Sequence, residues 1–169
     1  MPSPQLRDNY YQSLAWPSVV KSVLALHDAA AAKDIWTPAT GKKFRVLGWD
    51  LQVMVNVTLQ AAAAGDYVLM YDEVVTKPIA VLGIVQDGLP VAGSILSSSA
   101  QTGVGAFAQA VTEMGANILA PSHTIPGGYL SSAANNDVKV ALLVAATGAV
   151  VDVGSGELRI AGLIWGHEE

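Results

Sequence analysis

The strongest constraint on the fold is an alternation of apolar and polar side chains between residues 42 and 59. The apolar set comprises Leu47, Trp49, Leu51, Val53, Val55 and Val57. The polar set between them comprises Asp50, Gln52, Asn56 and Thr58. A period of two places successive side chains on opposite faces of a strand. The stretch therefore predicts a long strand of an antiparallel sheet with one face in the core and one face toward water.

Further strand signals follow residue 33, with turn residues about every ten positions. The predicted strands cover residues 35–37, 67–72, 74–85, 137–145 and 157–165. Pro78 suits the third of these to the edge of a sheet. With about eight strands, no βαβ rhythm and no repeat of fixed period, we expect an all-β fold. The specific expectation is an antiparallel β-sandwich of jelly-roll type, formed by residues 33–169 and preceded by an N-terminal arm.

Two stretches look irregular. Residues 91–128 are the hardest to interpret, and Pro121, Pro126, Gly127 and Gly128 predict that no regular element lies between residues 120 and 129. Residues 154–156, with the sequence Gly-Ser-Gly, predict a tight turn.

Residues 1–32 are assigned to the arm. Within them, residues 17–28 fit both a short helix, through the i, i+3, i+4, i+7 spacing of Val20, Val23, Leu24 and His27, and a strand with period two. Both interpretations stay open. The arm also carries three aromatic side chains within seven residues, Tyr10, Tyr11 and Trp16. Because aromatic residues are enriched at binding anchors, we predict that these three contact a partner.

The composition indicates that part of the folded protein's apolar surface is buried against a partner. Charged residues make up 14% and hydrophobic residues 51% of the sequence, and the mean hydropathy is +0.40. Charge is well below the share usual for soluble domains, so a membrane or a subunit interface must cover the apolar surplus. We find neither an apolar run long enough for a spanning helix nor a secretory signal, and we predict homo-oligomer contacts. The net charge of −5 argues against a nucleic-acid surface.

Residues for catalysis are sparse. The chain has no cysteine, and its three histidines, His27, His123 and His167, lack metal-ligand spacing. Asp72 and Glu73 are adjacent and favour a hairpin turn over a pair of catalytic carboxylates. The end of the sequence, residues 167–169, is predicted to be a solvated tail. We predict no catalytic, cofactor-binding or metal-binding residue, and a protein that is not an enzyme.

Several phrases of the sequence resemble small virion proteins of tailed bacteriophages. The phrase typical of their opening strand, "aGkrirvlgy", compares with TGKKFRVLGWDL at residues 40–51, and "gtvtLyDg" compares with AGDYVLMYD at residues 64–72. The closing phrase, "NndlkvalsaatgavsGtvwgyEE", compares with residues 135–142, 145–148 and 164–169. The resemblance covers roughly residues 33–85 and 127–169.

The resemblance implies a jelly-roll subunit that forms a homotrimer on a phage particle. Its expected partners are further copies of itself and the major capsid protein or another virion protein, with no nucleic acid and no membrane. Its expected location is the capsid surface, after synthesis in the host cytoplasm. The leading function is therefore a non-enzymatic capsid decoration protein that stabilises the shell.

Two other classes of function are alternatives. A carbohydrate- or receptor-binding module of a phage tail or head fibre would use exposed aromatic residues beside polar ones, with Tyr129 and His123 as candidates. An enzyme of cupin type would need several converging His and Glu ligands, and three scattered histidines give it the least support.

Overall fold

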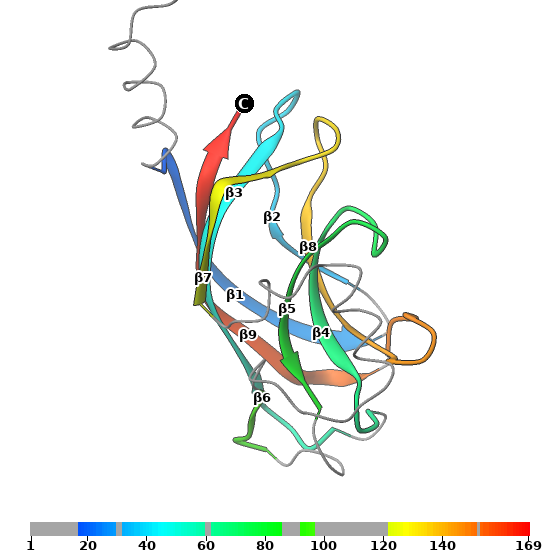
Figure 1. Ribbon diagram of the computed structural model, residues 1–169. Helices are drawn as coiled ribbons and strands as arrows, with labels where there is room; N and C mark the ends of the chain where they lie inside the picture. The colour runs from blue at the N-terminus through cyan, green and yellow to red at the C-terminus, as the bar shows by residue number, and fades with distance from the viewer. Residues whose placement is uncertain (1–16, 30–31, 60–61, 86–91, 97–121, 152) are drawn as a thin grey trace, which may run out of the picture.

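The computed structural model describes residues 17–29, 32–59, 62–85, 92–96, 122–151 and 153–169 (Figure 1). These residues form strands and no helix. The strands are β1 (Val19–Ala29), β2 (Lys33–Trp36), β3 (Phe44–Val55), β4 (Tyr67–Asp72), β5 (Pro78–Ile84), β6 (Ile95–Leu96), β7 (Ser122–Leu130), β8 (Val138–Leu143) and β9 (Val153–Glu168).

The strands form two antiparallel sheets. The first has the order β1-β9-β3, and the far edge of β3 pairs with β7 near its start and with β6 near its end. The second has the order β2-β8-β4-β5. The sheets lie face to face as a β-sandwich, which confirms the predicted all-β class (Figure 1).

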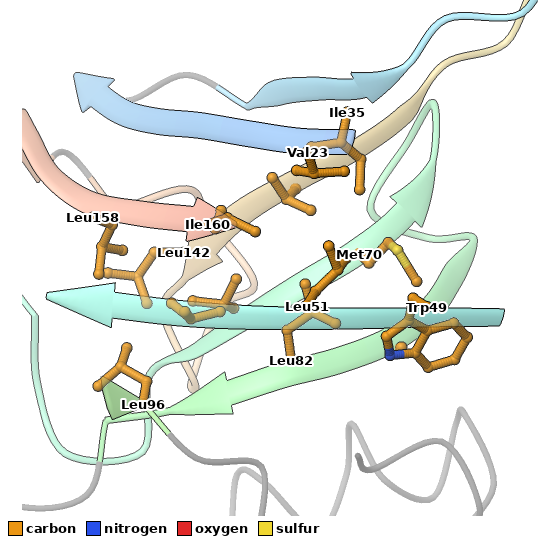
Figure 2. Packing of buried hydrophobic residues seen from close by; sticks show 14 of the residues in the cluster. Val23, Ile35, Trp49, Leu51, Met70, Leu82, Leu96, Leu142, Leu158 and Ile160 are labelled. Atoms are coloured by element: carbon orange, nitrogen blue, oxygen red, sulfur yellow. The ribbon is translucent and has the colours of Figure 1, made fainter. Parts of the chain in front are cut away.

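The main core lies between the sheets. In β3, Trp49, Leu51 and Val53 are buried while Asp50 and Gln52 are exposed, as the period of two predicts. These side chains meet apolar residues of the second sheet, including Met70 of β4 and Leu142 of β8 (Figure 2). Burying a side chain of this size contributes about 1.5–3 kcal/mol, so the alternation accounts for how the sheets associate.

A second apolar cluster lies on the opposite face of the second sheet. It comprises Tyr67, Leu69, Tyr71, Val81, Ile84, Ala141 and Leu143. These residues alternate along β4 and β8 with those of the main core, and all six residues of β4 are buried. The strands β4, β5 and β8 of the second sheet are therefore buried on both faces.

The N-terminal segment differs from its predicted role as an arm. Residues 19–29 form β1, which pairs with β9 from Val19–Gly166 to His27–Leu158 and again at Ala29–Val153. The strand interpretation is correct and the helix interpretation is wrong, because β9 supplies hydrogen-bond partners along the segment and the core buries Val23. Residues 1–16, the remainder of the predicted arm, lie outside the described residues.

Two predicted interruptions are strands instead. β7 runs through Pro126, Gly127 and Gly128. Its pairing moves from Tyr129–Val46 to Thr124–Gly48, and the irregular step between these pairs accommodates a proline and two glycines with positive φ. Residues 154–156 belong to β9 and do not form a turn. The other predicted strands are present, and β5, with Pro78 as its first residue, lies at a sheet edge.

Candidate functional site

The outer side of the first sheet carries an apolar surface, here called the outward face. Its residues are Val20, Ser22, Leu24, Asp50, Gln52, Met54, Ile95, Arg159, Ala161, Leu163 and Trp165. They alternate along β1, β3 and β9 with residues of the main core, which places them on the solvent side of the sheet.

Register arranges the outward face in rows across the strands. The rows are Val20–Trp165–Gly48, Ser22–Leu163–Asp50, Leu24–Ala161–Gln52 and Arg159–Met54–Ile95. Residues in one row are neighbours across hydrogen-bonded strands, about 4.8 Å apart. The apolar side chains are therefore contiguous.

Exposure on the outward face is large for apolar side chains. Leu24 is 68% exposed, Val20 58% and Leu163 44%, and Ile95 at the far end of the face is 57% exposed. Scattered apolar residues are ordinary on a surface, whereas a contiguous group of them is typical of an interaction site. Pairing of β1 with β9 creates this surface, and part of the apolar surplus in the composition lies there.

A polar cluster around Asp72, at one end of the sandwich, is the second candidate site. Asp72 is fully buried and its carboxylate accepts hydrogen bonds from the Ser132 amide at 2.8 Å and the Asn136 side chain at 2.7 Å. The Tyr129 hydroxyl donates at 3.1 Å and the Ser131 hydroxyl at 3.3 Å. Burial by itself would raise the pKa of Asp72, but these hydrogen bonds outweigh it and hold the pKa below its usual range.

Glu73 extends the polar cluster. It follows the end of β4 with φ of 59°, as a turn residue, and its carboxylate accepts from the Asp137 amide at 3.0 Å and from Lys139 Nζ at 2.8 Å. These two donors lower the pKa of Glu73, and the same ion pair raises the pKa of Lys139. Asp72 and Glu73 thus lie where β4 enters the turn to β5, as predicted. Their carboxylates accept hydrogen bonds from the end of β7 and from the connection between β7 and β8. The arrangement is structural.

The C-terminal residues of the sequence are held in place, contrary to the predicted solvated tail. Glu168 accepts from the indole N–H of Trp36 at 3.0 Å and from the Ala39 amide at 3.0 Å, and both bonds lower its pKa. Arg45 binds the Glu169 carboxylate through Nε and Nη2 and lowers its pKa in turn. The prediction failed because position in the sequence does not reveal that β9 runs to Glu168 between β1 and β3.

The residues predicted for binding have different outcomes. Tyr10, Tyr11 and Trp16 lie outside the described residues, so their partner contacts stay a prediction. His123 lies in β7 rather than in a loop, and its backbone pairs with Trp49. Tyr129 is half-buried, stacks on Phe44 and donates to Asp72, which raises its pKa together with burial. Its ring and hydroxyl are therefore engaged within the fold.

The described parts of the chain contain neither a candidate metal site nor a helix that could span a membrane. In these ranges, no group of three His, Asp or Glu side chains is placed to hold a metal ion. The same ranges contain no helix with the length and hydropathy that a bilayer crossing requires. Comparisons with protein-family models, with curated proteins and with solved structures find no match.

Proposed function

We propose that this protein is a non-enzymatic structural component of a phage virion, a capsid decoration protein that assembles as a homotrimer and stabilises the shell. The observation that carries the proposal is the outward face, where exposed Val20 and Leu24 of β1 flank exposed Leu163 of the adjacent strand β9. An apolar surface of this kind is suited to contacts between subunits.

The order of strand pairing supports a jelly roll. β1 pairs with β9, β2 with β8, β3 with β7 and β4 with β5, so the pairs are nested from the outermost to the innermost. The additional pairs β3–β9 and β4–β8 join these hairpins into two sheets. Folding one long antiparallel hairpin over on itself would produce nested pairs of this kind, and the proposed jelly roll, with its two Greek keys, is built in that way.

Attachment to the shell is assigned to Tyr10, Tyr11 and Trp16, which precede β1 in the sequence. Because β1 is part of the sandwich, its removal would expose a backbone edge of β9. The residues for shell binding are therefore tested by substitution and not by truncation into β1.

The test uses purified protein and phage capsids that lack it. We expect the protein to co-sediment with the capsids, to increase their resistance to heat, and to appear as added density on the capsid surface in electron micrographs. The Tyr10→Ala/Tyr11→Ala/Trp16→Ala variant should keep its mass in light scattering but lose co-sedimentation. Absence of the protein from purified virions, or capsids equally heat-resistant without it, would contradict the proposal.

The alternative of a carbohydrate- or receptor-binding module has less support. One of its two candidate residues, Tyr129, is committed to Phe44 and Asp72. A glycan array with the full chain distinguishes the two functions, since a decoration protein should bind none of the glycans.

A further inference from the structure

The charges on the outward face have a pattern that points to its partner. Within the rows from Val20 to Ile95, the described side chains include two charges, Asp50 and Arg159. Both side chains are exposed. Each can therefore form an ion pair with a group that approaches the face from outside.

Asp50 and Arg159 lie on opposite sides of one row. The row Leu24–Ala161–Gln52 has the row of Asp50 on one side and the row of Arg159 on the other. A two-fold axis that lies in the plane of the face and runs along this row exchanges the rows on its two sides. It therefore brings the row of Asp50 in one copy over the row of Arg159 in the other, and the reverse contact forms at the same time.

The distances that this exchange requires are small. Asp50 is on β3 and Arg159 on the adjacent strand β9, so the two residues are offset by one strand spacing of about 4.8 Å. An arginine side chain spans that offset, and the crossing angle of about 30° usual for packed sheets changes it only slightly. Leu24 and Ala161, in the row on the axis, then face the same residues of the partner, and Leu163 packs on the aliphatic part of the partner's Arg159.

We propose that the outward face packs against the outward face of a second copy of this chain about a two-fold axis, with two reciprocal Asp50–Arg159 ion pairs across an apolar centre. A surface with one acid and one base placed in this way is complementary to itself. A partner with charge of one sign would be repelled by one of the two residues.

This inference rests on the self-association in the proposed function and assigns the outward face to a two-fold contact, so the three-fold contact of a trimer must use another surface of the chain. If the three-fold contact also forms, the two-fold contact joins two trimers into a hexamer, and otherwise it gives a dimer. Light scattering and sedimentation velocity at about 50 μM, a concentration that detects micromolar association, should give one of these two masses. A trimer would overturn the inference and leave the proposed function intact, whereas a monomer would overturn both the two-fold contact and the proposed homotrimer. Binding to capsids tests attachment to the shell separately.

The sharper test reverses the two charges separately in the full chain. Asp50→Arg and Arg159→Asp should each raise the dissociation constant of the two-fold contact roughly 10- to 100-fold, because each places like charges opposite one another. An equimolar mixture of the two variants should regain association, since every facing pair is then of opposite sign. Lys42→Asp, a charge reversal at an exposed residue off the face, should have no effect.

The outcomes are distinct. Recovery in the mixture, together with unchanged circular dichroism of each variant, supports the inference. A mixture that associates no better than its components overturns it. The same holds if Tyr10→Ala/Tyr11→Ala/Trp16→Ala abolishes the two-fold contact, because the segment before β1 would then be the occupant of the face.

Discussion

Two buried carboxylates connect loops of this sandwich that lie far apart in the sequence. Asp66 accepts from the Ala63 amide at 2.8 Å and from the Ala145 amide at 3.0 Å. Asp72 accepts from Tyr129, Ser131, Ser132 and Asn136. A buried charge is tolerated only where hydrogen bonds replace its lost hydration. Each carboxylate therefore stabilises one conformation of the loops that it binds. The positions of Asp66 and Asp72 beside turns suggested this structural role only in part.

Replacement of Asp72 tests this role. Asp72→Ala leaves the Ser132 amide and the Asn136 side chain without their acceptor, and we expect the free energy of unfolding to fall by about 3 kcal/mol. Asp34→Ala is the matched control, since Asp34 is 52% exposed and lies 3.8 Å from Lys139, and it should cost less than about 0.5 kcal/mol. Urea denaturation measures both, and equal losses would contradict the role given to Asp72.

The pH dependence of stability follows from the same groups. Asp72, Glu73, Glu168 and Glu169 have pKa values lowered in the folded state, so the unfolded chain binds more protons in acid. Their contribution is complete above the unfolded pKa of about 4 and is lost as pH falls through the lower folded values. We expect the urea midpoint to be level at neutral pH and to decrease steadily below about pH 4.5.

At alkaline pH, stability is expected to decrease as pH rises, because two tyrosines have raised pKa values in the folded state. Burial raises the pKa of Tyr71 and Tyr129, so their contribution is complete below about pH 10 and is lost as pH rises further. Tyr129→Phe should reduce the decrease of the urea midpoint above pH 10. Because the variant also removes one of the hydrogen bonds that lower the pKa of Asp72, it should slightly reduce the decrease of the midpoint in acid. An unchanged alkaline limb would contradict this explanation.

At the scale of elements, the ladder between β3 and β9 organises the first sheet. It extends from the pair Phe44–Glu168 to the pair Val55–Leu158. The two backbones approach so closely at Gly162 that a Cβ there would overlap the carbonyl oxygen of Asp50, and Gly162 has φ of +144°. Glycine is required at this position for both conformational and steric reasons.

Gly162→Ala should therefore lower the free energy of unfolding by about 2–4 kcal/mol, because a side chain would strain the backbone and separate β3 from β9. Gly148→Ala separates the two causes. Gly148 also has positive φ, at 66°, but no atom lies within 4 Å of the position that a Cβ would take there, so only the conformational cost of about 1 kcal/mol applies. Similar losses for both variants in thermal or urea unfolding would show that close approach is unimportant at Gly162.

Strands were predicted correctly where apolar and polar residues alternate within the strand itself. The alternation around Leu51 and Val140 predicted β3 and β8, because one face of each strand is in the core. Prediction failed at Gly127, Gly128 and residues 154–156, where glycine and proline indicate a break. There the residues on either side of each break pair with distant strands, Thr124 and Tyr129 with β3 and Val153 and Leu158 with β1. The residues between them are accommodated as irregular steps in these ladders.

At the scale of the whole molecule, the two sheets differ in how they are covered. The strands β4, β5 and β8 of the second sheet are buried on both faces, whereas the first sheet leaves Leu24 and Leu163 exposed. Further copies of the chain are the partner that we propose for this surface. Association of folded chains stabilises them by mass action, so the unfolding temperature should depend on protein concentration.

For a two-chain complex, a hundredfold increase in concentration should raise the Tm by about 4 °C. Leu24→Glu should remove this dependence, because it places a charge in the centre of the outward face. Val57→Glu is the control, since Val57 is also exposed, at 48%, but follows the end of β3 and lies off the face. Differential scanning calorimetry at several concentrations measures the effect, and a Tm independent of concentration in the unmodified chain would contradict self-association through this surface.

The sequence alone determined the all-β class, most of the strands and the presence of an apolar surplus, because alternation and turn residues are local and composition is a sum over the chain. Only the tertiary structure decided where that surplus lies, that residues 19–29 are a strand, and that Asp72 and Glu168 are anchors. Each of these depends on pairing between segments more than 50 residues apart. Hydrogen-bond register and burial arise when such segments meet, and a local pattern contains no information about which segments will do so.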